Sequence, residues 1–242
     1  MYGTADLTIA SETARPATSA VGDIRARIAG VGALGFAGIV VLQNLIRGGS
    51  APSNGASSDD VLAHYADHRA LTVLLVSTFM IGGTALTVFL GGAMRRLTAV
   101  RPGWAYTGYA GAVGVLALFA TMLGTEVSLS VVAAGDAPST SAIQALWALH
   151  NSMFTMLFLF IGVALVGLSR AGVAAGITPR AFERVAPVSF ALLTVAAVAG
   201  PLTAAGDAMV FFGVGLAGFL VWLAFLITTG LRLVRSESGI DV

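Results

Sequence analysis

The sequence predicts an all-α integral membrane protein, a bundle of six transmembrane helices with both termini in the cytoplasm. Of the 242 residues, 57% are hydrophobic and only 10% are charged, whereas soluble domains carry about 25% charged residues. The mean hydropathy is +0.89. The apolar residues also gather in six runs, each near the ~20 residues that a helix needs to cross a bilayer.

The six runs define the expected spans and leave a polar tail at each end. Residues 1–22 contain Ser, Thr, Pro and scattered acids, a composition typical of a disordered cytoplasmic tail. A signal peptide would begin with a basic segment. Residues 23–235 form the expected transmembrane domain, and residues 236–242 a second cytoplasmic tail. The expected spans are 28–46, 71–92, 107–132, 142–168, 185–205 and 210–233.

The orientation follows from arginine, which supplies all thirteen basic residues. Cytoplasmic loops carry an excess of positive charge. Only Arg47 and Arg69, both in the first loop, lie on the expected outer side. The abundance of Ala, Gly, Val and Arg suggests a GC-rich genome. We expect the membrane to be a bacterial inner membrane. The arginines on the expected cytoplasmic side are Arg15, Arg25, Arg27, Arg95, Arg96, Arg101, Arg170, Arg180, Arg184, Arg232 and Arg235.

Two polar residues inside the apolar hairpin 106–169 are the main candidates for a site. Glu126 lies in its first run and His150 in its second. At ~1.5 Å rise per residue, both lie ~10 Å below the same face of the bilayer. A charge there costs ~2.5–3.5 kcal/mol, so it should face the bundle interior and have a partner. We expect Glu126 to meet His150, with Ser130 and Asn151 completing a polar pocket in the outer half.

Three functions fit such a pocket. The first is the binding or transport of a small solute, a proton or a lipid. The second is a metal-dependent enzyme embedded in the membrane, although the sequence contains no nucleotide-binding or hydrolase motif, which disfavours an enzyme. The third is a structural or accessory subunit in which the pair only holds helix register. The net charge of +1 argues against a nucleic-acid partner, and the absence of Cys excludes disulfides and thiolate metal ligands.

The first loop, residues 47–70, is the longest and carries a predicted helix over residues 59–69. Ser57 with an acid at position 60 is a typical helix start. His64 and His68 are four residues apart and share a helical face, a spacing that a zinc or iron site can use. If this helix folds over the bundle, these histidines could approach the Glu126 pocket. The alternative is a solvated helix that only caps the bundle.

Small residues four apart predict that some spans approach one another closely. Three sets have this spacing within the apolar runs. They are Ala29/Ala33/Ala37, Gly108/Ala112 and Gly213/Ala217.

Three stretches within the first hundred residues resemble uncharacterised six-span membrane proteins of actinobacteria. The resemblance implies a fold and no activity, so it assigns no catalytic residue. The stretches are Gln43-Asn-Leu-Ile46, Ser58-Asp-Asp-Val-Leu-Ala-His-Tyr-Ala-Asp-His68-Arg69 and Gly91-Gly-Ala-Met-Arg-Arg-Leu97.

Overall fold

The structure, a computed structural model, describes residues 17–48 and 50–235, with side chains from Ile24 onward. Within these residues every regular element is an α-helix. Five helices are long and apolar enough to cross a bilayer. The structure therefore confirms the all-α class and fits a multi-pass membrane protein. The five are α1 (Ala17–Arg47), α3 (Arg69–Val100), α4 (Pro102–Ala133), α5 (Thr140–Ala174) and α8 (Met209–Arg235).

The apolar run expected as one span over 185–205 is broken in the structure. It forms α6 (Phe182–Val198) and the short α7 (Gly200–Ala204), which meet at Ala199. Pro201 causes the break, because a proline ring clashes with the preceding turn and lacks an N–H. The 17 residues of α6 span about 26 Å, less than the ~30 Å hydrocarbon core. Of the expected N-terminal tail, residues 17–22 are helical as the start of α1, so that part of the prediction was wrong. Residues 1–16 and the expected second tail, residues 236–242, lie outside the described residues.

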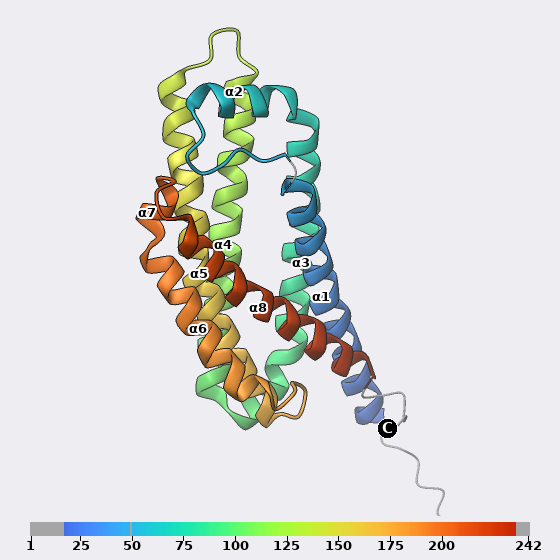
Figure 1. Ribbon diagram of the computed structural model, residues 1–242. Coiled ribbons are helices and arrows are strands. Elements are labelled where there is room, and N and C mark those ends of the chain that lie inside the picture. Colours follow the sequence, from blue (N-terminus) through green and yellow to red (C-terminus); the bar gives the residue numbers. More distant parts are fainter. Residues whose placement is uncertain (1–16, 49, 236–242) are drawn as a thin grey trace, which may run out of the picture.

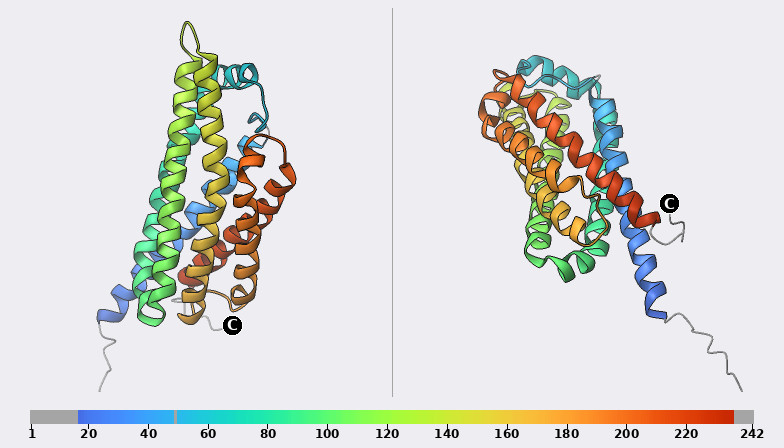
Figure 2. Two further views of the ribbon diagram at one scale, coloured as in Figure 1. Left: turned by 90° about the vertical axis from the view of Figure 1, so that its left-hand side faces the viewer. Right: turned by 60° about the horizontal axis from the view of Figure 1, so that its bottom comes forward.

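The long α4–α5 hairpin forms the centre of the bundle. Helix α3 packs against α1 and α4, α6 packs against α5, and α8 crosses the bundle diagonally to contact α1, α5 and α6 (Figure 1). Helix α2 (Ser58–Asp67) packs against the last turns of the hairpin, just below its tip (Figure 1; Figure 2). We call this the α2 end.

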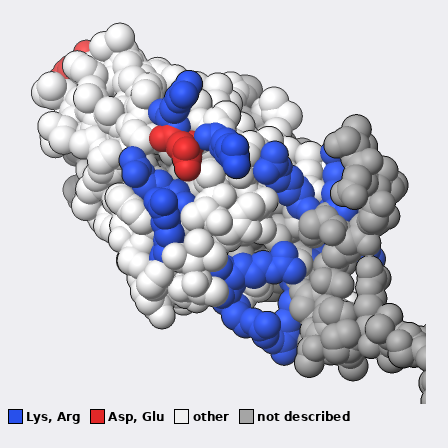
Figure 3. Space-filling model, turned by 90° about the horizontal axis from the view of Figure 1, so that it is seen from below, with Lys and Arg blue, Asp and Glu red and all other residues white. Residues whose placement is uncertain are grey.

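The opposite end of the bundle gathers arginine, as Figure 3 shows from below. Helix α1 starts there, α8 ends there, and the α3–α4 and α5–α6 connections lie there (Figure 1). The α2 end instead carries Arg47 and Arg69 among several aspartates. The charge pattern read from the sequence therefore coincides with the two ends of the fold. The arginines of this arginine-rich end are Arg25, Arg27, Arg95, Arg96, Arg101, Arg170, Arg180, Arg184, Arg232 and Arg235.

Glycine lets α4 and α5 approach until their backbones touch. A Cβ added to Gly108 would lie 2.4 Å from the backbone nitrogen of Leu168, and one added to Gly167 would lie 2.2 Å from that of Gly108. A Cβ on Gly111 would lie 2.4 Å from the nitrogen of Ala164. We call the backbone contact made by the four small residues Gly108, Gly111, Ala164 and Gly167 the α4–α5 seam.

The other two small-residue sets behave differently from one another. Ala29, Ala33 and Ala37 are each at most 1% exposed, and a Cβ on Gly92 of α3 would lie 2.6 Å from the Cβ of Ala29. Ala33 lies near α8, since a Cβ on Gly230 would lie 3.2 Å from its Cβ. The expected close approach is therefore found, with α3 at Ala29 and with α8 at Ala33. A Cβ on Gly213 would meet nothing within 4 Å, so the expectation of a close approach there was wrong.

The segment between α1 and α2 is held in place by polar contacts. Ser57 caps α2 by accepting a hydrogen bond from the backbone N–H of Asp60 at 3.2 Å, which confirms the predicted helix start. The Asn54 side chain donates to the carbonyl of Thr203 at 3.1 Å. Gly206, with φ +88°, passes so close to Gly55 that a Cβ would lie 2.9 Å from its Cα. A side chain at position 206 would therefore be strained by both backbone angle and space.

Candidate functional site at the α2 end

Three charged or titratable side chains from three helices meet below α2. Arg47 is the last residue of α1, while Glu126 lies in α4 and His150 in α5. Arg47 donates to both carboxylate oxygens of Glu126, through Nη2 to Oε2 at 2.9 Å and through Nη1 to Oε1. Nε2 of His150 lies 3.0 Å from Oε1. We call these three residues the polar triad.

Burial makes the triad more than a surface ion pair. The Glu126 side chain is 1% exposed, that of His150 is 11% exposed and that of Arg47 is 24% exposed. A bidentate arginine–carboxylate pair has strong directional hydrogen bonds. A buried carboxylate that loses such a partner is costly, because water cannot replace it. The hydrogen bonds from Arg47 and His150 therefore stabilise the negative charge of the buried Glu126 carboxylate.

The triad also joins two parts of the bundle. Helix α1 packs against α3 and α8, and its last residue reaches across to the α4–α5 hairpin. The α4–α5 seam determines the second contact of the triad, that between Glu126 and His150. From the touching pair Gly108 and Gly167, Glu126 lies 18 residues further along α4 (126 − 108), and His150 lies 17 residues back along α5 (167 − 150). Both distances are about 26 Å in an α-helix, so the seam brings the carboxylate and the imidazole to one level.

Aromatic and amide side chains enclose the imidazole of His150. Its ring stacks on Trp147, with ring centroids 5.0 Å apart and an interplanar angle of 7°. Tyr65 of α2 packs edge-on against the same tryptophan at 6.4 Å. Asn151 donates from Nδ2 to the carbonyl of Asn54 at 3.1 Å, and its Oδ1 lies 3.4 Å from Nδ1 of His150. The α1–α2 segment, α2 and α5 together form the roof over Glu126.

A small cavity connects the triad to the histidines of α2. Its volume is about 20 Å³, which is room for one water molecule. Arg47, Glu126, His64, Tyr65 and His68 contribute to its wall. The fold thus brings the two α2 histidines to the same cavity as Glu126.

The two α2 histidines stack on each other rather than converge on a common point. Their ring centroids are 4.6 Å apart with an interplanar angle of 19°, and Nδ1–H of His68 can donate to the carbonyl of His64 at 3.0 Å. Within the described part of the chain, no group of three or more His, Asp or Glu side chains is placed to hold a metal ion. The geometry therefore gives His64 and His68 no third ligand.

The titration of α2 depends on its burial against the bundle. Burial lowers the pKa of His64, and the neighbouring His68 lowers it further. Burial, reinforced by the charge of Glu126, raises the pKa of Tyr65, so its phenol stays protonated. Because docking of α2 lowers the pKa of His64, this histidine binds a proton more readily when α2 is undocked. The difference matters as the pH falls below about 6.5, the usual pKa of histidine. Acid therefore works against docking of α2, and neutral pH favours it.

The structure brings some of the predicted site residues together and leaves others apart. Glu126 and His150 are in contact, and Asn151 lies beside the imidazole. Ser130 is buried, but its hydroxyl makes no hydrogen bond within the described residues, so it does not complete the cluster as expected. Sequence reasoning missed Arg47, which it counted only as a loop charge, and it did not identify Trp147, whose ring stacks on His150.

Comparison with known proteins adds no template for this site. The chain matches no family model, no curated protein and no solved structure. The site must therefore be interpreted from its own chemistry.

Proposed function

We propose that the chain is a six-span protein of a bacterial inner membrane, with both termini and the arginine-rich end in the cytoplasm. The positive-inside rule supports this orientation, because arginines gather at one end of the fold. Helices α6 and α7 would make the sixth crossing as a broken span, which is tolerated when it packs within protein. The resemblance to six-span actinobacterial proteins agrees with this proposal.

Cysteine labelling tests the topology, since the natural chain contains no Cys. Single variants Asp136→Cys, Asp207→Cys and Ala174→Cys place a thiol at three exposed positions. The first two lie in connections between helices, and the third is the last residue of α5. On intact cells, a membrane-impermeant maleimide should label the first two and spare the third until the cells are broken. Protection of Asp207→Cys in intact cells would mean that α6 and α7 do not cross. Labelling of Ala174→Cys in intact cells would show that the chain has the opposite orientation in the membrane.

For the activity, we propose that the polar triad binds a proton that arrives from the α2 end. The observation that carries this proposal is a 1% exposed carboxylate held by Arg47 and His150 beside a water-sized cavity. A proton on the Glu126 carboxylate makes the triad more positive by one charge. The neutral carboxyl attracts Arg47 less strongly, so proton binding would loosen α1 from the α4–α5 hairpin.

The size of the cavity favours a proton over the larger ligands considered from the sequence. A drug-sized solute needs a pocket of about 300–1,000 Å³, and a lipid needs more. The cavity beside Glu126 has about 20 Å³. His64 and His68 lie in its wall, and imidazole rings serve as proton shuttles in proteins, which supplies a route through one water molecule.

Binding is better supported than transport across the membrane. The buried polar side chains on the arginine-rich side of the triad are hydroxyls, such as Ser189 and Thr178, and amides, such as Gln43. Among the described residues no buried carboxylate or histidine lies there. A proton relay needs a chain of titratable groups. The metal-dependent enzyme has less support, because His64 and His68 lack a third ligand. The structural role remains the alternative, since the triad would also tie the helices together without a proton.

Distance measurements between spin labels test whether a proton opens the triad. Labels at Leu45→Cys on α1 and Val131→Cys on α4 occupy exposed positions, 74% and 60% exposed, away from the triad. In lipid nanodiscs, the distance distribution should broaden toward longer values as the pH is lowered from 7. Glu126→Gln should give the longer distances at every pH. If the distance distribution of the wild type did not change with pH, the triad would have a structural role only.

A further inference from the structure

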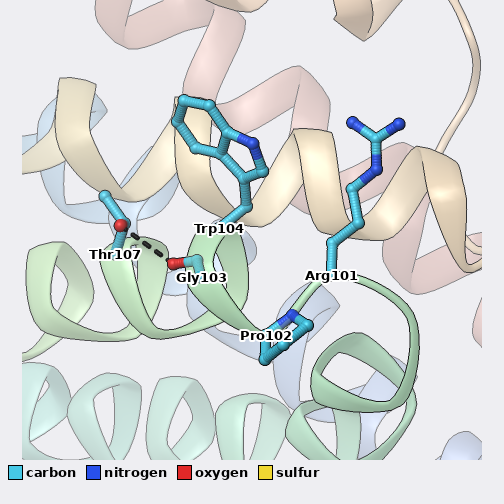
Figure 4. A pocket seen from close by; sticks show the side chains of 5 residues that line it. All are labelled: Arg101, Pro102, Gly103, Trp104 and Thr107. Carbon is cyan, nitrogen blue, oxygen red and sulfur yellow. Dashed lines mark hydrogen bonds between the residues drawn. The ribbon is translucent and has the colours of Figure 1, made fainter.

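A groove at the arginine-rich end is separate from the polar triad. It lies where α4 begins, has a volume of about 390 Å³, and is lined by Arg101, Pro102, Gly103, Trp104 and Thr107 (Figure 4). Arg101 and Trp104 project to the same side of the start of α4 (Figure 4). The groove is therefore large enough for a headgroup-sized ligand.

The groove is cationic and contains no acidic side chain. Arg101 lines it, and the guanidinium of Arg170 from α5 lies 4.9 Å from the centre of the Trp104 ring. Within the described residues, neither arginine forms an ion pair. The positive end of the α4 dipole points the same way, and a Cβ on Gly103 would meet nothing within 4 Å, so the backbone there is open. These features favour an anion, and the planar guanidinium of an arginine suits a phosphate.

The level of the groove points to a lipid as the source of that phosphate. Trp104, Tyr106 and Tyr109 are 37%, 62% and 43% exposed around the first two turns of α4. Exposed Trp and Tyr at the end of a span typically lie at the headgroup level of a bilayer. Basic pockets between spans at this level suit anionic headgroups.

We propose that this groove binds the phosphate of an anionic phospholipid headgroup, with Arg101 as the main phosphate ligand. Arg170 adds positive charge and holds the Trp104 ring, which packs beside the headgroup. The site lies at the opposite end of the bundle from the triad. The proposal is therefore independent of proton binding, and either can fail alone.

Native mass spectrometry of the full chain in neutral detergent tests the proposal. The protein is titrated with phosphatidylglycerol or with zwitterionic phosphatidylcholine, and inorganic phosphate is added in a third arm. The wild type should retain phosphatidylglycerol in preference to phosphatidylcholine. Arg101→Ala should lose about fivefold in that retention, the effect of one arginine near a charged lipid, and Arg101→Lys should recover most of it. Arg95→Ala is the matched control, since it removes an exposed arginine from the same end.

Three outcomes would overturn the proposal. The first is equal retention of the two lipids by the wild type. The second is an equal loss in Arg101→Ala and Arg95→Ala, which would indicate only diffuse attraction by the arginine-rich end. The third is binding of inorganic phosphate that depends on Arg101 without any preference for phosphatidylglycerol, which would assign the groove to free phosphate.

Discussion

Arg47→Ala should lower the free energy of unfolding by about 3–5 kcal/mol, the usual cost of removing one partner from a buried ion pair. The substitution leaves Glu126, which is 1% exposed, with His150 as its remaining partner. Unfolding of the purified protein in detergent micelles, followed by circular dichroism, measures this effect. The variant should also bind a proton at Glu126 more readily, because the arginine that stabilises the charged carboxylate is absent.

Two further variants separate the triad from a general effect of charge. Arg69→Ala removes the other arginine of the α2 end, which is exposed, and should change the free energy of unfolding by less than about 0.5 kcal/mol. The double variant Arg47→Met/Glu126→Leu replaces the pair by apolar groups and should recover much of the loss. Equal effects of Arg47→Ala and Arg69→Ala would contradict the buried pair.

Gly167→Ala should destabilise the protein by about 1–3 kcal/mol, near the upper limit for one added methyl group in a filled interior. The new Cβ would lie 2.2 Å from the nitrogen and 2.4 Å from the Cα of Gly108. Backbone atoms cannot move aside as a side chain does, so α4 and α5 must separate along the seam. Because the seam sets the level of Glu126 against His150, the same variant should also weaken the triad. The spin-label distances at pH 7 would then lengthen.

Gly124→Ala is the control for this prediction, since it makes the same change in α4 where a Cβ meets nothing within 4 Å. There the added methyl group should stabilise the helix by about 0.5–1 kcal/mol, because alanine loses less backbone freedom than glycine. If both variants had the same stability in detergent, the backbones of α4 and α5 would not touch as the structure places them.

The contact between Glu126 and His150 could be predicted because it follows from helix rise and from the cost of an isolated charge in a bilayer. Both are properties of one hairpin. Arg47 could not be placed in the same way, since its position depends on how α1 packs against α3 and α8. The available signal was that Arg47 ends an apolar run on the side that otherwise lacks arginine. Ser130 was misplaced because spacing along α4 says nothing about the rotamer of its hydroxyl.

The fold itself was predictable where hydropathy alone decides it, and less so at breaks. Five apolar runs appear as long helices, but Pro201 divides the sixth. The position of α2 could not be derived from the sequence. It depends on contacts between distant residues, among them Asn54 with Thr203 and with Asn151. These contacts bring His64 and His68 to the triad.

The central claim, that Glu126 itself takes up the proton, is tested most directly by infrared difference spectroscopy on acidification. The wild type should gain a carbonyl band of a protonated carboxyl in an environment poor in water. That band should be absent in Glu126→Gln and unchanged in Glu183→Gln, which removes an exposed carboxyl at the arginine-rich end. A band that persists in Glu126→Gln would contradict proton binding at this residue.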